Sequence, residues 1–288
     1  MATELEIKLS VSATNQARAL KWLAARPEVR PGHPSSLINR YFDTPLADLN
    51  QAKAALRVRK AGDAYVQTLK TRGDFVDGAH CREEWEWPIA SPDLDLSLLE
   101  ETPLAGRLDL DRLQVVFETN FERQVLWLED AHSLIEVAVD AGSIVAGQVQ
   151  WPLNEVEFEL KSGDGGKLVE SALALAREVP VFLNLVSKAE QGYFLAGIYH
   201  PKPIEPGEIL SVTGLLQALS TSWLLDQPFV VKAYDLGRIT KAAEATGCSE
   251  LWRQVSRELD QGVRVRELAN GSGELGRFQL QLASAGHD

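Results

Sequence analysis

Charged and aliphatic residues alternate along several segments in the first 200 residues of the chain. Residues 3–11, for example, read TELEIKLSV, so that Glu and Lys alternate with Leu and Ile. Successive side chains of a strand point to opposite faces. The segment therefore predicts a strand with one ionic face and one apolar face. Taken alone, it is also the pattern of an ordinary amphipathic strand whose ionic face meets water.

The same kind of patterning predicts secondary structure along the rest of the chain. Candidate strands are 4–11, 37–43, 54–60, 64–72, 81–89, 117–128, 133–139, 144–148 and 153–161. Apolar residues at helical spacing predict helices at 14–26, 165–178, 187–197, 208–225, 237–247, 249–261 and 272–285. Many short strands with few helices favour a barrel or a sandwich for the first part.

Three prolines indicate a linker at 201–207, between a domain at 1–200 and a helical module at 208–288.

The polar faces of the predicted strands are strongly ionic, and the two signs are grouped. Acidic residues mark the first and last strands, and arginines dominate the basic strands between them, which suits bidentate contact with phosphate-like oxygens. If the ionic faces turned inward, the apolar faces would need an outer coat, part of which the helices at 14–26 and 165–178 could supply. Such a barrel would be a wet tunnel. Because buried charge needs partners, we expect it to take up a polyanion and a divalent cation.

Composition narrows the possible functions. The chain has 288 residues, 45% of them hydrophobic, and a formal net charge of -12. This acidic balance argues against a general nucleic-acid binder and against attraction to anionic membranes. The first residues do not read as a signal peptide, and no apolar run reaches the ~18 residues that a membrane span needs. Cys81 and Cys248 match no disulfide or metal spacing, so we expect a cytoplasmic protein.

Nine segments carry a resemblance to a known family. They are ELEIK at 4–8, RYFDTP at 40–45, LRVRK at 56–60, TLKTRG at 68–73, CREEWE at 81–86, FERQVLW at 121–127, IEVAVDAGSI at 135–144, EVEFELKSG at 155–163 and SKAEQGY at 187–193. In this order they resemble the CYTH superfamily of triphosphate tunnel metalloenzymes, over residues 1 to about 197. The resemblance implies an α+β fold, an antiparallel eight-stranded β-barrel tunnel with flanking helices. The helical C-terminal module would follow it.

The resemblance and the strand faces together imply roles for the charged residues. A divalent cation, Mg²⁺ or Mn²⁺, prefers carboxylate oxygens. The expected metal ligands are Glu4, Glu6, Glu157 and Glu159, and also Glu136 and Asp140 unless these two pair with neighbouring arginines. The expected phosphate clamp is Lys8, Arg57, Arg59, Lys70, Arg82, Arg123 and Lys188, unless these residues only form salt bridges in the barrel wall. Glu4, Glu6 and Lys70 are the expected catalytic residues, with Lys70 or a second metal activating water.

Within the family, the chain looks most like the bacterial inorganic triphosphatases. The implied reaction splits inorganic triphosphate into pyrophosphate and phosphate. A thiamine triphosphatase, a class IV adenylyl cyclase and a non-catalytic polyphosphate-binding module are the alternatives. The expected partner is a small molecule that contains a triphosphate, with no nucleic acid and no membrane, and a homodimer is compatible with the sequence. Residues 208–288 lack the basic, His-containing helices of the CHAD domain that follows in some relatives, and are expected to pack on the tunnel or on a second chain.

Overall fold

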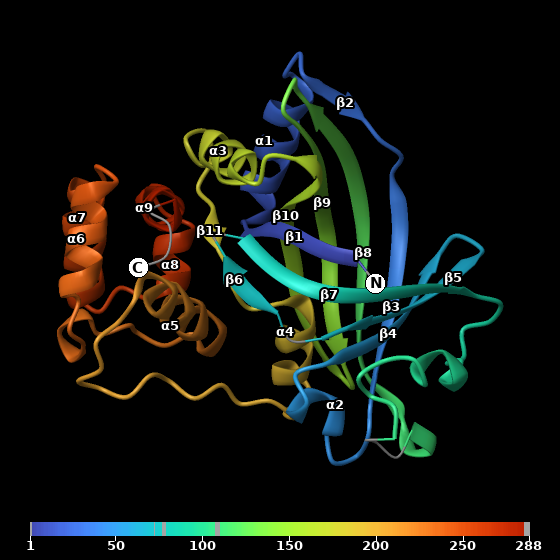
Figure 1. The fold of residues 1–288 in the computed structure, drawn as a ribbon. Helices are drawn as coiled ribbons and strands as arrows, with labels where there is room; N and C mark the ends of the chain where they lie inside the picture. The colour runs from blue at the N-terminus through green and yellow to red at the C-terminus, as the bar shows by residue number, and fades with distance from the viewer. Residues whose placement is uncertain (1, 72, 77–78, 107–109, 285–288) are drawn as a thin grey trace.

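The computed structural model describes residues 2–71, 73–76, 79–106 and 110–284 (Figure 1). Its strands are β1 (Ala2–Ser10), β2 (Val29–Pro31), β3 (Ser35–Asp43), β4 (Ala55–Ala61), β5 (Ala64–Lys70), β6 (Asp74–Val76), β7 (Ala79–Ile89), β8 (Gln114–Glu129), β9 (Ser133–Ala146), β10 (Val149–Gly163) and β11 (Phe182–Leu183). Its α-helices are α1 (Ala13–Ala24), α2 (Asp48–Gln51), α3 (Gly166–Ala176), α4 (Lys188–Leu195), α5 (Val212–Leu225), α6 (Gly237–Ala245), α7 (Ser249–Asp260), α8 (Val265–Ala269) and α9 (Glu274–Ala283). Its 3₁₀ helices are η1 (Leu96–Leu99), η2 (Leu110–Arg112) and η3 (Val231–Ala233).

Eight of the described strands form one antiparallel series, in the order β1, β10, β9, β8, β3, β4, β5 and β7. β7 also pairs with β1, so the last strand of the series meets the first. β1 pairs with β7 through residues 2–6 and with β10 through residues 6–10. The predicted α+β fold, with an antiparallel tunnel-like sheet, is therefore confirmed. The shorter strands β2, β6 and β11 pair with β8, β7 and β1.

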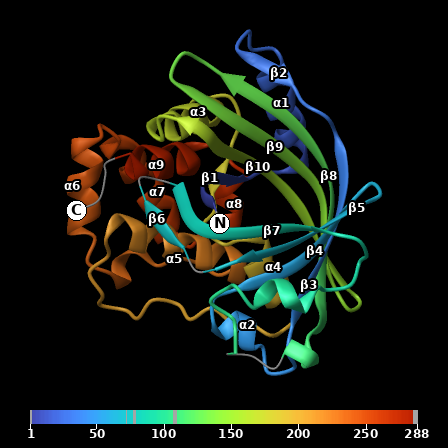
Figure 2. The ribbon, with the colours of Figure 1, turned by 45° about the vertical axis from the view of Figure 1, so that its right-hand side comes forward.

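The apolar faces of the strands point away from the tunnel and pack under helices. Ile7 and Leu9 of β1 are fully buried, in one cluster with Leu23 of α1 and with Leu168 and Leu175 of α3. Both helices lie outside the strands (Figure 2). Each of these aliphatic side chains contributes about 1.5–3 kcal/mol when it leaves water. This part of the hydrophobic core thus lies outside the tunnel, as the alternating pattern predicts.

One predicted break in the sheet is wrong. The sequence pattern suggests separate strands at 133–139 and 144–148, but the structure has a single strand, β9. Gly142 lies inside this strand, and a Cβ there would approach the backbone oxygen of Asn120 to 2.1 Å and the Cα of Phe121 to 2.5 Å. The glycine therefore permits the close approach of β8 and does not mark a turn.

Helix α4 lies against the inner side of β8, β9 and β10 (Figure 2). Ser187 begins the helix with a capping box, because its hydroxyl accepts from the backbone N–H of Glu190 while the Glu190 carboxylate accepts from the backbone N–H of Ser187. A Cβ on Gly192 would come within 2.1 Å of the Phe117 ring, so glycine lets the helix sit close to β8. These features hold Lys188, the first residue of the helix, in the tunnel.

The five C-terminal helices pack around their own apolar cluster and also against the strands. Phe182 of β11 stacks on Trp223 of α5, with ring centroids 5.9 Å apart. Gln279 of α9 exchanges two buried hydrogen bonds of 3.0 Å with the backbone of Leu183. Leu216 of α5 belongs to the same cluster as the outer faces of β1 and β10. The helical tail is thus fixed on the tunnel, while a domain boundary at 201–207 stays a prediction. Among the described helices, none has both the length and the apolar character that a membrane crossing requires.

Candidate functional site

The strands enclose a cavity of about 740 Å³ whose wall is ionic. The sequence pattern places the charged face of β1 inward, and the structure confirms this, because Glu4, Glu6 and Lys8 all line the cavity. The basic side chains in the described lining are Lys8, Lys53, Arg57, Arg59, Lys70, Arg123, Lys161 and Lys188, and the acidic ones are Glu4, Glu6, Glu84, Glu86, Glu136, Glu157, Glu159 and Glu190. The described wall thus carries eight groups of each sign, yet the two signs are unevenly distributed over it.

One side of the cavity gathers arginines with few acidic partners. Arg59 donates from Nε to Asn39 Oδ1 at 3.0 Å, and Arg57 donates to the Tyr41 hydroxyl at 3.4 Å. Burial and the charges of Arg57 and Arg123 together lower the pKa of Arg59 to about 10. Cationic neighbours that lower the pKa of Arg59 in this way form a region of positive potential around it, which is suited to an anion.

A network of ion pairs around Lys188 and Arg123 lies beside these arginines. Lys188 Nζ lies 2.6 Å from Glu157 Oε1, 2.7 Å from Glu155 Oε2 and 3.0 Å from Asp140 Oδ2. Arg123 binds Asp140 through two parallel hydrogen bonds of 2.7 Å and reaches Glu157 at 2.9 Å. Burial alone would lower the pKa of Lys188, but its three carboxylate partners raise it well above the usual value. The network therefore fixes both cations in place.

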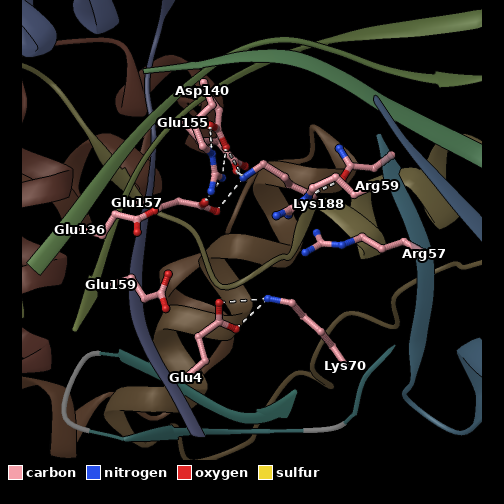
Figure 3. A network of polar contacts seen from close by, with 12 residues as sticks. Glu4, Arg57, Arg59, Lys70, Glu136, Asp140, Glu155, Glu157, Glu159 and Lys188 are labelled. Atoms are coloured by element: carbon pink, nitrogen blue, oxygen red, sulfur yellow. Dashed lines mark hydrogen bonds and ion pairs between the residues drawn. The ribbon is translucent and has the colours of Figure 1, made fainter. Parts of the chain in front are cut away.

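Carboxylates gather on the opposite side. Figure 3 shows Glu4, Glu136 and Glu159 on one side of the cavity, with Arg57 across from them. Burial raises the pKa of Glu159, and the charges of Glu4 and Glu136 raise it further, against the effect of Lys161 at 2.6 Å. A carboxylate whose ionisation its neighbours oppose in this way is stabilised by a hard divalent cation, which takes oxygen ligands.

The donor chemistry of this wall fits a divalent cation, although the side chains are not drawn into a finished site. Within the part of the chain that the structure describes, no three His, Cys, Asp or Glu side chains converge closely enough to hold a metal ion. The acids are instead engaged by lysines: Lys70 Nζ lies 2.8 Å from Glu4 Oε2 and 3.2 Å from Glu84 Oε1. Lys161 likewise lies between Glu159 and Glu136.

The structure brings most of the predicted site residues to one cavity. These are Glu4, Glu6, Lys8, Arg57, Arg59, Lys70, Arg123, Glu136, Glu157, Glu159 and Lys188. Asp140 is different: it is fully buried behind the wall, and both its carboxylate oxygens bind Arg123. This geometry agrees with pairing to arginine, the alternative to metal binding. The backbone of Arg82 lies opposite Glu4 on β7, but its side chain is outside the described part of the structure.

Two basic residues of the cavity, Lys161 and Lys53, were not among the predicted site residues. Lys161 shares the polar face of β10 with Glu157 and Glu159, so the alternation at 155–161 could have indicated it. Lys53 follows α2 with a positive φ of 57°, and its Nζ lies 5.4 Å from the centre of the Tyr199 ring. Both residues line the cavity; the alternation of the predicted strand points to Lys161, but no strand pattern points to Lys53.

Comparisons with known proteins agree with this geometry. The model of the CYTH domain matches residues 2–193. An inorganic triphosphatase of Haemophilus influenzae is 34% identical over 204 residues, which cover 68% of this chain and 55% of that protein. This chain thus spans about half the length of that curated relative.

One solved structure supports the same fold. A Hippeastrum protein, described as a candidate adenylyl cyclase with a dominant triphosphatase activity, has a TM-score of 0.50 and 20% identity, over 69% of this chain and 98% of its own. The triphosphatase of the Mimivirus capping enzyme has a TM-score of 0.41 and 11% identity, over 62% and 89% of the two chains, which is too slight to carry an argument. From the family match and the arrangement of its strands, the chain belongs to the CYTH family.

Proposed function

We propose that this protein hydrolyses inorganic triphosphate to pyrophosphate and phosphate with the help of Mg²⁺ or Mn²⁺. The observation that carries the proposal is the division of one cavity into a side rich in arginine, around Arg57 and Arg59, and a side rich in carboxylates, around Glu4 and Glu159. Phosphoryl transfer requires chiefly positioning of the phosphates and neutralisation of their oxygens. The two sides offer these two functions separately. The name of the Haemophilus influenzae relative supports the choice of substrate.

The balance of charge in the cavity supports the use of a metal. The described lining has eight basic and eight acidic groups, so it holds no overall excess of positive charge for a substrate with several negative charges. A divalent cation bound with the substrate would supply that excess. Glu4, Glu6, Glu136 and Glu159 are the oxygen donors that would hold it, whereas Glu157 already binds Lys188 and Arg123. When bound there, the cation would neutralise phosphate oxygens and polarise the phosphorus.

The protein's own side chains have distinct tasks in this reaction. Arg57 and Arg59 bind the oxygens of the phosphate chain, because their side-chain hydrogen bonds go to the neutral groups of Tyr41 and Asn39 and the ion pair of Arg57 with Glu84 is long, at 3.8 Å. Arg123 and Lys188 extend this clamp from the network with Asp140. A water molecule attacks the terminal phosphorus, the bond from that phosphorus to the bridging oxygen breaks, and pyrophosphate leaves with that oxygen.

Lys70 and Glu4 are placed to serve the attacking water. The Lys70 ammonium donates to both oxygens of Glu4, at 2.8 and 3.0 Å, and therefore acts as a donor that orients its partners. The Glu4 carboxylate is the acceptor of this pair and could orient the water by accepting a hydrogen bond from it. Glu6, on the same face of β1, lies next to this pair along the cavity wall.

A phosphate-release assay tests the proposal. Triphosphate, thiamine triphosphate and ATP would each be offered with Mg²⁺, with Mn²⁺ and with a chelator, and product analysis would detect a cyclic nucleotide. We expect metal-dependent release of phosphate, fastest from triphosphate. Faster turnover of another substrate would reassign the activity, and tight binding of polyphosphate without turnover would favour a non-catalytic module.

Variants of the acidic wall connect the activity to the cavity. We expect Glu4→Gln to abolish metal-dependent turnover through the loss of an oxygen donor, and Glu157→Gln to abolish it through the loss of the partner that positions Lys188 and Arg123, while both variants stay folded. Glu122→Gln is the matched control, since Glu122 is exposed on β8 and does not line the cavity. If Glu4→Gln retains the full activity of Glu122→Gln, the assigned role of Glu4 is wrong.

A further inference from the structure

Helix α5, from the C-terminal part of the chain, forms part of the cavity wall. Thr213 and Gln217 are four residues apart, so they lie on one face of the helix, and both line the cavity. The other faces of α5 are buried. Leu216 packs in the cluster that covers the outer side of the strands, and Leu215 and Leu219 pack in the cluster of the C-terminal helices. The helix is therefore held from two sides with its third face toward the cavity.

The position of α5 follows from the way β1 is paired. Only residues 2–6 of β1 pair with β7. Beyond them, Leu9 and Ser10 lie opposite β11, and the backbone N–H of Asn184 donates to the carbonyl of Lys8 at 3.1 Å. The segment that follows β11 thus covers the second half of β1, and it leads directly into α4.

A buried hydrogen bond joins this segment to α5. The backbone N–H of Leu185 donates to the hydroxyl of Ser220 at 3.0 Å, and the Ser220 side chain is fully buried. Leu185 and Ser187 of the segment line the same cavity as Gln217. In Figures 1 and 2, α5 lies beside β6. Helix α5 therefore forms part of the wall beside this segment.

We propose that α5 is a substrate-binding element of the tunnel, in which the Thr213 hydroxyl and the Gln217 amide donate hydrogen bonds to phosphate oxygens. The inference rests on the proposed triphosphatase function and extends it to residues 208–288. Among the described residues, neither side chain is hydrogen-bonded to another part of the protein, and Gln217 is exposed. Both are neutral donors in a wall that is rich in charged groups. They can bind anionic oxygens without altering the balance of charge in the cavity.

A pair of matched substitutions tests this role in the full-length protein. Gln217→Glu places a carboxylate in the cavity, and Gln227→Glu makes the same change at an exposed position just beyond α5 that does not line the cavity. We expect Gln217→Glu to raise the KM for triphosphate about tenfold or more, because a donor to a charged acceptor is replaced by a like charge. The kcat should change little, and Gln227→Glu should match the wild type. Thr213→Val and Gln217→Ala should raise KM by a smaller factor.

The outcomes separate this inference from the proposed function. If the wild type hydrolyses triphosphate and Gln217→Glu, Gln217→Ala and Thr213→Val all keep its KM, α5 is not a binding element, although the triphosphatase function stands. If the wild type neither hydrolyses inorganic triphosphate nor binds it with Mg²⁺ in calorimetry, the proposed function itself fails. Thermal unfolding of each variant shows whether the fold is kept, and Gln217→Ala carries the test if Gln217→Glu does not fold.

Discussion

Replacing Asp140 by asparagine separates its two expected roles, metal ligand and anchor of the phosphate clamp. Asp140 is fully buried, and it accepts two hydrogen bonds of 2.7 Å from Arg123 and contacts Lys188 at 3.0 Å. Asparagine has nearly the same shape but carries no charge, and one of its two polar atoms is a donor. The substitution therefore removes the carboxylate that both cations share.

The size of the effect follows from the partners that remain. Removing one member of a buried ion pair costs about 3–5 kcal/mol. Arg123 and Lys188 both keep Glu157, at 2.9 and 2.6 Å, so we expect the lower end of that range, about 3 kcal/mol. Against a typical unfolding free energy of about 5–15 kcal/mol, the variant should still fold. Freed from Asp140, Arg123 should be less well placed for phosphate, and the KM for triphosphate should rise.

Urea unfolding and steady-state kinetics measure the two effects. Asp63→Asn is the control, because Asp63 is exposed in the turn between β4 and β5. A shift of the urea midpoint with a raised KM, at an unchanged metal requirement, is the expected result. A wild-type midpoint and a wild-type KM would refute the reasoning. A change confined to the metal concentration that gives half-maximal activity would restore Asp140 as a ligand.

Three further substitutions test other parts of the structure. Arg59→Ala should raise the KM for triphosphate about tenfold to a hundredfold, since a hydrogen bond to a charged group is worth about 1.5–3 kcal/mol. The control is Arg40→Ala, because Arg40 is half-exposed and does not line the cavity. If the two variants have equal KM values, Arg59 is not part of the clamp. Glu159 has a raised pKa in the folded protein, so the folded state holds this proton more tightly than the unfolded state and stability falls as the pH rises from 4.5 through the raised pKa. Glu159→Gln should therefore raise the melting temperature at neutral pH and flatten its fall with pH, and a lower melting temperature at neutral pH would contradict this. Gly192→Ala should lower the free energy of unfolding in urea by about 1–3 kcal/mol and weaken triphosphate binding, because its Cβ would meet the Phe117 ring and displace α4. A variant as stable as the wild type would show that the Phe117 ring can move aside without cost.

Alternation of residue types predicted the orientation of the strands well. A period of two fixes which side chains share a face, and the ionic face of β1 could be placed inward once arginine-rich and acidic strands were found to recur in the same chain. The helices that cover the apolar faces, α1 and α3, were also predicted, since their aliphatic residues recur at helical spacing.

Other features depend on contacts that the sequence pattern does not encode. The role of Gly142 depends on how closely β8 approaches β9, and the neighbouring sequence does not specify this distance. The role of Asp140 depends on depth: it shares a face with Glu136, yet only Glu136 reaches the cavity. Thr213 and Gln217 could not be assigned to the site, because the packing of α5 beside β11 joins segments that are far apart in the chain.

The two faces of β1 lie in different environments, and this affects how the strand tolerates substitutions. Leu5, Ile7 and Leu9 pack toward the helices, whereas their neighbours at 4, 6 and 8 face the cavity. A saturation scan along this strand, scored once for cellular abundance and once for catalysis, should give two oscillating profiles of the same period, half a cycle out of step. Selection could therefore remodel the chemistry of the interior through every second codon while the codons between them preserve the fold.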